Sequence, residues 1–258
     1  MMKLIQNEFL KLHAKKSMYI LLVVLAVLEF AEAVIIKKWA PSELKIEGYI
    51  MFAEQHIGMI ATFATIFGIT LASRTITEEF QKGTIKQLLI RPRKRVTILF
   101  SKYITVLLAI LFVCIASLLI AMLIGLIVFG GGTGEVTFAI VLKRFAYNIL
   151  PIFFYPTVAF LLANIFRKLV LPLIITLFFF FLDGSLKMLL FQFAKGVAKY
   201  VVMFHLNLNV YDSNEFLNQG AKPMFSEFTF LTSLLFVLAH FVVLLVISSA
   251  LFQRRDVL

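Results

Sequence analysis

Six apolar stretches, each of roughly 17 to 26 residues, constrain the fold of this 258-residue chain more than any other feature. An apolar run of about 20 residues crosses the hydrocarbon of a bilayer as a helix. Because 61% of the residues are hydrophobic, a water-soluble fold could not bury so much apolar surface. The sequence predicts an all-α integral membrane protein that forms one domain. The expected spans are residues 17–36, 57–73, 104–129, 145–166, 169–193 and 230–252.

An additional amphipathic helix is expected over residues 2–16. Its apolar residues recur at helical spacing, and its charged residues occupy the other faces. Such a helix lies flat at a membrane interface. The apolar residues are Met2, Ile5, Phe9 and Leu12, and the charged ones include Lys3, Glu8, Lys11 and Lys15.

The polar segment 74–103 orients the chain. It carries eight Lys/Arg against Glu78 and Glu79, and the positive-inside rule places such a segment in the cytoplasm. On the topology that follows, both termini are cytoplasmic, and the cytoplasmic pieces contain sixteen of the 25 Lys/Arg. The net charge of +11 is therefore an orientation signal, and nucleic acid is not an expected partner. We expect a multi-pass membrane protein.

Local signals predict a short helix at the start of this segment. Thr75 and Glu78 form a capping-box pattern, and Ile76 and Phe80 lie four residues apart on one face. Gly83 can end this helix. Two interpretations remain open: a structured loop on the lipid headgroups, or a docking element for a partner.

A second short helix is predicted after Gly83. Thr84 can cap it, and Pro92 breaks it because proline disfavours helix at the residue before it. Taken in order, this segment resembles the first cytoplasmic loop of bacterial ABC exporter permeases of the second type. The resemblance rests on Glu78, Glu79, Gly83, Thr84, Leu88, Leu89, Pro92, Arg95, Ser101 and Lys102.

The resemblance implies a permease subunit with a cytoplasmic coupling helix, paired with a second permease chain that is identical or paralogous. A separate ATPase would dock on the loop and bind ATP and magnesium, since the chain contains no Walker A motif. We expect no catalytic residue, metal site or cofactor in this chain. The implied docking residues are Thr75, Ile76, Glu78, Glu79, Phe80, Gly83 and Thr84.

The substrate is less constrained by the sequence. The shortness of the chain resembles permeases that export amphipathic or antimicrobial peptides, but drugs, lipids and ions remain alternatives. Rival interpretations are a membrane scaffold or sensor that binds an ATPase without transport, and a membrane enzyme that acts on lipid. Membrane lipids are expected partners in every case.

Glu29 and Glu32 lie three residues apart in the outer half of the first span. A carboxylate in hydrocarbon is costly, so each should lie near the outer interface or face other helices. They are candidate contacts for a cationic substrate. The alternative is an interfacial pair with Lys37 and Lys38 nearby.

Small residues recur every four positions in the second and third spans, which allows close helix packing. We expect these two stripes to pack against each other. They comprise Ala64, Gly68 and Ala72, and Ser117, Ala121 and Gly125.

Other polar residues give weaker signals. Asp183 and Lys187 are four apart in the fifth span and can neutralise each other on one helical face. Residues 191–202 fit either a re-entrant segment or an amphipathic surface helix. Residues 205–228 are predicted to be a solvated loop without a metal site, because no ligand spacing repeats there. Cys114 is the only cysteine and therefore forms no intramolecular disulfide.

Overall fold

The computed structural model describes residues 1–39, 41, 46–81, 94–132 and 135–254, and among these it contains helices and no strands. Five helices are long and apolar enough to cross a membrane, which confirms the prediction of an all-α integral membrane protein. These helices are α2 (Ser17–Trp39), α3 (Tyr49–Gln81), α5 (Arg95–Phe129), α6 (Phe138–Phe166) and α11 (Phe230–Arg254).

The predicted span 169–193 is not one straight helix. It is divided into α7 (Val170–Phe181) and α8 (Asp183–Phe193), which are bent by 63°. At 1.5 Å per residue α7 is about 18 Å long, too short to cross a hydrocarbon core of about 30 Å. Asp183 favours the break because a carboxylate is stabilised in the first turn of a helix. The two helices make a sixth span only if they are counted together.

Short helices connect α8 to α11: α9 (Lys195–Ala198), η2 (Val202–His205), η3 (Leu208–Tyr211) and α10 (Glu215–Asn218). This region is not simply a solvated loop, because His205 is buried. Its Nδ1 lies 3.0 Å from Ser233 Oγ of α11, and its Nε2 lies 2.9 Å from the Lys199 carbonyl oxygen. The connection is therefore anchored on the bundle.

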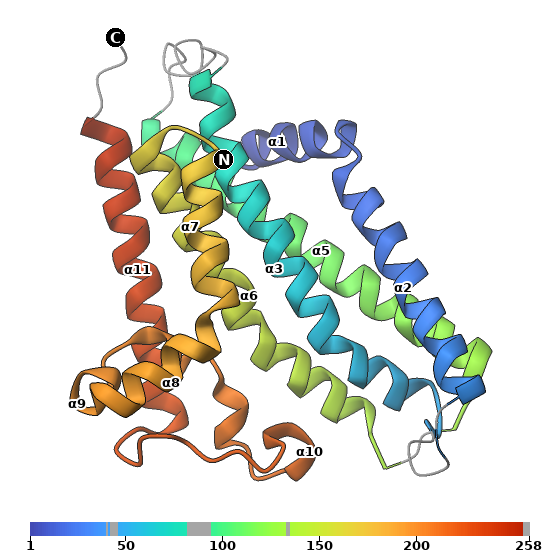
Figure 1. Ribbon diagram of the computed structural model, residues 1–258. Coiled ribbons are helices and arrows are strands. Elements are labelled where there is room, and N and C mark those ends of the chain that lie inside the picture. Colours follow the sequence, from blue (N-terminus) through green and yellow to red (C-terminus); the bar gives the residue numbers. More distant parts are fainter. Residues whose placement is uncertain (40, 42–45, 82–93, 133–134, 255–258) are drawn as a thin grey trace.

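The helix α1 (Met2–Ala14) lies crosswise at one end of the bundle, where the N-terminus and the last turns of α3 and α11 also lie (Figure 1). We call this the α1 end. The opposite end, which carries α9 and α10, is called the α10 end. Lys16 has a left-handed φ of 56°, and the chain turns there from α1 into α2.

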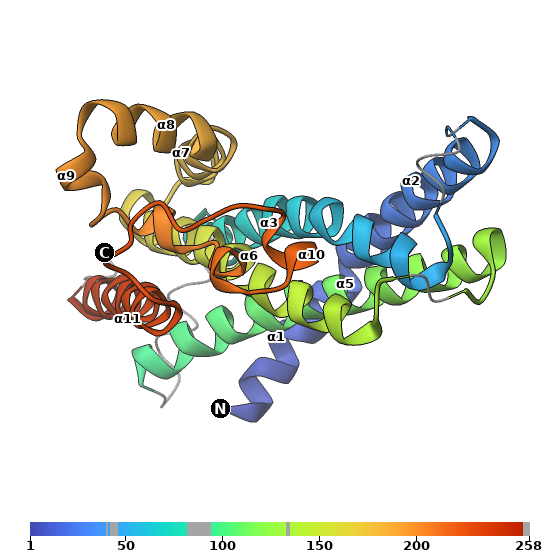
Figure 2. The ribbon, with the colours of Figure 1, turned by 90° about the horizontal axis from the view of Figure 1, so that it is seen from below.

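The centre of the bundle consists of α3, α5 and α6, with α2 on one side and α7 and α11 on the other (Figure 2). All six residues of the predicted small-residue stripes are buried. At Gly68, an added Cβ would lie 2.5 Å from Ile110 Cδ1 on α5 and 2.6 Å from Pro156 Cγ on α6. At Gly125, it would lie 2.9 Å from Tyr49 Cα. Each glycine therefore allows another helix to approach closely. The nearest atoms belong to residues outside the stripes, so the predicted contact between the two stripes is not observed at Gly68 or Gly125.

The predicted helix start at Thr75 is wrong. Residues 74–81 are the last turns of α3, which extends beyond the predicted span 57–73 at both ends. The Thr75 hydroxyl donates to the Leu71 carbonyl oxygen at 2.7 Å, as a threonine inside a helix does. Gly83, Thr84 and the second short helix lie outside the described residues. Apolar length alone also placed the starts of α5 and α6 too late. The first turns of α5 mix polar and apolar residues, and the apolar first turn of α6 is followed by the charged pair Lys143 and Arg144.

Two glycines of α3 provide a matched test of this packing. We expect Gly68→Ala to lower the thermal midpoint of the purified protein, because its new methyl group meets α5 and α6 at a cost of about 1–3 kcal/mol. Gly58→Ala meets no atom within 4 Å and gains about 1 kcal/mol of helix propensity. The measurement is the monodisperse fraction after heating in detergent. Equal midpoints for the two variants would contradict close packing at Gly68.

Candidate functional site

Lys102, in the second turn of α5, is the centre of an ionic network at the α1 end. Its side chain is 3% exposed, and its Nζ donates to Glu8 Oε2 of α1 and to Glu79 Oε1 of α3, both at 2.9 Å. Hydrogen bonds between ionised partners are the strong ones in proteins. One ammonium group therefore joins three helices that are distant in the sequence.

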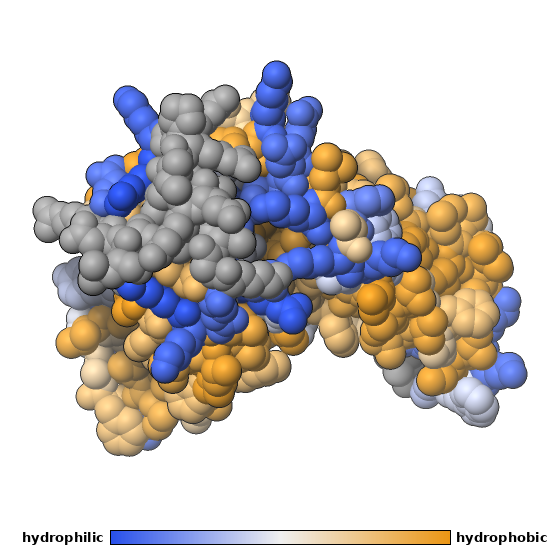
Figure 3. Space-filling view, turned by 90° about the horizontal axis from the view of Figure 1, so that it is seen from above, coloured by the Kyte–Doolittle hydropathy of each residue, from blue (hydrophilic) through white to orange (hydrophobic). Residues whose placement is uncertain are grey.

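Further pairs surround this centre, and hydrophilic side chains gather on this end of the molecule (Figure 3). Two of these pairs connect α1 and the residue after it to the last turns of α3, and the other two lie within one helix; the apolar surface lies on the flanks. The pairs are Lys11–Glu8 (2.8 Å), Lys11–Glu79 (3.6 Å), Lys15–Glu78 (2.5 Å) and Arg74–Glu78 (3.8 Å).

The network holds Glu8 in its ionised form. Burial by itself raises the pKa of this carboxyl, but the ammonium groups of Lys102 and Lys11 more than offset it, so the pKa of Glu8 lies below its ordinary value of 4.5. A lowered folded-state pKa contributes stability above the unfolded-state pKa, and this contribution is lost as the pH falls through the folded-state pKa. Glu8 therefore contributes to the attachment of α1 at neutral pH, and this contribution is lost in acid.

Several of the predicted docking residues contact other parts of this chain. Ile76 is 1% exposed and lies in the core, so it does not offer an apolar contact to a partner. Phe80 is partly buried, and the Arg167 guanidinium lies 5.2 Å from the centre of its ring. Glu78 and Glu79 are engaged in the network. These residues hold the end of α3 in place within the chain.

Glu29 and Glu32 differ sharply in their surroundings. Glu29 is fully buried between α2 and α5, where Ser117 Oγ donates to its Oε1 at 2.9 Å. It is therefore not available to a substrate in this conformation. The Glu32 side chain is half exposed, and its Oε2 lies 3.2 Å from Nε2 of the buried His56. The alternative expectation is that these acids pair with the nearby Lys37 and Lys38. Lys37 instead donates to the Val128 carbonyl oxygen at 2.6 Å.

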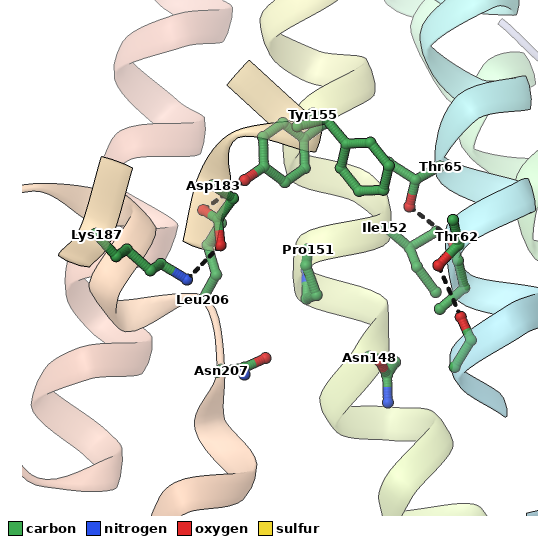
Figure 4. Close-up of a pocket in the computed structure, with 13 residues that line it drawn as sticks. Thr62, Thr65, Asn148, Pro151, Ile152, Tyr155, Asp183, Lys187, Leu206 and Asn207 are labelled. Carbon is green, nitrogen blue, oxygen red and sulfur yellow. Dashed lines mark hydrogen bonds and ion pairs between the residues drawn. The ribbon is translucent and has the colours of Figure 1, made fainter. Parts of the chain in front are cut away.

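A second polar site is a cavity of about 210 Å³ between α3, α6 and the break between α7 and α8 (Figure 4). Its apolar wall includes Pro151, Ile152 and Phe180. Polar groups converge on it from four parts of the chain. They include Thr62 and Thr65 of α3, Asn148 and Tyr155 of α6, Asp183 and Lys187 of α8, and Asn207 after η2.

Asp183 organises one side of this cavity. The Tyr155 hydroxyl donates to its Oδ1 at 2.8 Å, and Lys187 Nζ lies 2.6 Å from its Oδ2. The predicted pairing of Asp183 with Lys187 is thus observed. Both charged side chains are also partly exposed, at 25% and 18%, whereas Tyr155 is buried. The pair is neutral as a unit, and polar groups at membrane depth commonly mark functional sites.

Sequence reasoning missed most of this cavity. Tyr155, Thr62 and Asn148 occur singly in apolar helices, and no short motif connects them. One available signal was the pair of prolines in α6, Pro151 and Pro156, which lie next to these polar residues. The helix α6 nevertheless continues without interruption through both prolines.

Comparison with known proteins matches most of the chain. Residues 4–183 match the sequence model of the ABC-2 family transporter protein group, a range that contains the ionic network and reaches Asp183. The chain is 26% identical over 251 residues to the uncharacterized membrane protein YdbK of Bacillus subtilis (strain 168), covering 96% of this chain and 99% of that protein. It is 27% identical over 208 residues to the uncharacterized protein YhcI of the same organism, covering 74% and 64% respectively.

The ionic network can be tested by removing its central charge. Lys102→Met removes the buried ammonium group that Glu8 and Glu79 share, while the more exposed Lys11 stays near both acids, so the expected cost is roughly 2–3 kcal/mol. We expect α1 to detach from the bundle. In a Cys114→Ser background, Leu12→Cys should then react faster with a soluble maleimide at neutral pH, because Leu12 is buried where α1 is attached.

Lys3→Met is the matched control, since Lys3 lies exposed on the same helix α1. It should leave the reactivity of position 12 unchanged. If Lys102→Met also leaves this reactivity unchanged, the network does not hold α1.

Proposed function

We propose that this chain, which belongs to the ABC-2 family of transporter proteins, is the permease subunit of an ABC exporter. A separate ABC ATPase docks at the α1 end and supplies the ATP and magnesium chemistry. The protein lies in a bacterial plasma membrane with the α1 end in the cytoplasm. It works with a second permease chain, identical or paralogous.

The observation that carries this proposal is the sharing of Lys102 between Glu8 and Glu79. The helices α3 and α5 continue from the membrane into the α1 end, and residues 82–93 connect them. Because Lys102 ties both helices to α1, a displacement of this connection moves two membrane helices and the interfacial helix together. A movement produced by ATP can reach the membrane by this route.

Docking is proposed on the connection itself, including Gly83 and Thr84, and on the exposed residues that flank it. Gln81 ends α3 and Lys94 precedes α5, and both are exposed. The acids of α3 then serve the partner indirectly by fixing the position of these flanks. This differs from direct contact through Ile76, which lies in the core.

The proposed substrates are amphipathic peptides, including antimicrobial ones. Glu32 is the proposed contact for a cationic substrate, because its carboxylate is half exposed on α2. Drugs, lipids or ions are the alternative cargo.

Topology gives the first test. With Cys114→Ser as background, Lys94→Cys should remain unlabelled when intact cells are treated with a membrane-impermeant maleimide, and it should be labelled after the membrane is opened. Lys143→Cys, whose native side chain is 60% exposed at the α10 end, should be labelled in intact cells. The reverse pattern would invert the proposed orientation.

Docking gives the second test. Gln81→Cys and Lys94→Cys should each form a crosslink to the cognate ATPase when the complex is treated with a short bifunctional maleimide after detergent extraction. Lys143→Cys serves as the control and should form none, because it lies at the other end of the bundle. An ATPase that copurifies but crosslinks only from position 143 would rule out docking at the α1 end.

A further inference from the structure

The cavity beside Asp183 and Lys187 has the properties of a small binding site. Its volume of about 210 Å³ is below the range of roughly 300–1,000 Å³ that drug-sized ligands occupy. A peptide of several residues is too large for it. The space suits a compact polar head.

The charges of the cavity select the chemistry of that head. Of the described residues that line it, Asp183 and Lys187 carry charge, one of each sign. A ligand with a net charge would add an uncompensated charge at membrane depth, which is costly. A zwitterion avoids this cost, because its ammonium group can meet Asp183 while its anionic group meets Lys187.

The hydrogen-bonding groups fit the same ligand. The Lys187 ammonium has three donors, and Asp183 occupies one of them. Asn148 donates through Nδ2 to the Arg144 carbonyl oxygen, so its Oδ1 can accept from a ligand ammonium. Asn207 is exposed at the cavity and can donate to an anionic oxygen (Figure 4).

The surface next to the cavity is suited to acyl chains. Phe180 lines the cavity, whereas its neighbours Phe178, Phe179 and Phe181 are exposed on α7. In a bilayer these rings contact lipid. A lipid whose tails lie along α7 would carry its head to the break between α7 and α8, where Asp183 begins α8.

We propose that this cavity binds the head of a zwitterionic aminophospholipid, a primary ammonium next to a phosphate, from the leaflet at the α10 end. The ammonium group donates to Asp183 and to Asn148 Oδ1, and the phosphate accepts from Lys187 and Asn207. The Asp183–Lys187 bond opens to admit the head, and two ligand ion pairs replace the internal one. Tyr155 keeps Asp183 in position through its hydrogen bond.

The experiment measures lipid binding by the purified protein in detergent, without an ATPase. Short-chain phosphatidylethanolamine, phosphatidylcholine and phosphatidylglycerol are titrated, and native mass spectrometry gives the fraction of protein that carries one lipid. We expect ethanolamine lipid to bind at least tenfold more tightly than the other two. Choline has no N–H to donate to Asp183, and the glycerol head has no cation.

The test variant is Asp183→Asn with Lys187→Gln, which removes both charges, preserves the neutrality of the cavity and changes little volume. In this variant, phosphatidylethanolamine should bind no more tightly than phosphatidylglycerol. The matched control is Lys199→Gln with Glu227→Gln, an ion pair of 2.9 Å at the same end but outside the cavity lining. This control should bind like the unmodified protein.

Several results would overturn the inference. These are equal affinity for the three heads, tighter binding of the glycerol lipid, or undiminished ethanolamine preference in the test variant. If the double variant is not monodisperse, Asn148→Ala replaces it. This variant should weaken the binding of phosphatidylethanolamine and leave the binding of the other two lipids unchanged. Because transport and the ATPase are absent from the assay, its outcome is separate from that of the proposed function.

Discussion

The close approach of α5 and α6 to α3 is the constraint on which the rest of the structure depends. A single Cβ at Gly68 would meet both neighbouring helices within about 2.6 Å, so the small residues of α3 set the spacing of the bundle. In a membrane, helices gain from van der Waals packing of this kind, because lipid tails give them no hydrophobic reason to associate. Buried residues of α3 extend from its first turn to Thr77.

Both polar sites are attached to this helix because it is longer than the hydrocarbon. Its 33 residues measure about 50 Å, against a core of about 30 Å. Thr62 and Thr65 therefore line the cavity within the bundle, while at the other end Glu79 pairs with Lys11 of α1 and Glu78 with Lys15 just after it. A rotation or tilt of α3 would alter both places together, which makes it the natural link between them.

Five of the six spans, apart from their ends, and the burial of their small residues were predictable from the sequence, because apolar length and four-residue spacing are local properties. The end of α3 was not. Thr75 and Glu78 match a helix start when they are considered alone, but the same residues continue a helix whose acids are stabilised by Lys15 and Lys102. Those partners lie far away in the chain. A capping pattern therefore identifies a helix start only where no earlier helix extends into it.

The cavity was also beyond local prediction, although part of it was foreseen. The spacing of Asp183 and Lys187 predicts their ion pair, since both lie on one helix. Tyr155 and Asn207 reach the same place only through the packing of α6 and the path of the chain after η2. Likewise, the hydrogen bond from Tyr155 to Asp183 joins α6 to the start of α8, and no local pattern in the sequence predicts it.

The two ionic sites differ in a way that fits different tasks. Lys102 is almost fully buried and shared by two carboxylates, so releasing it would take the buried cation away from both acids at once, and such an arrangement favours a fixed joint. Asp183 and Lys187 form a one-to-one pair beside a cavity, and both side chains are partly exposed. A ligand that brings one charge of each sign can replace this pair without leaving a charge unmatched. The first arrangement suits the transmission of movement, and the second suits an exchange of partners.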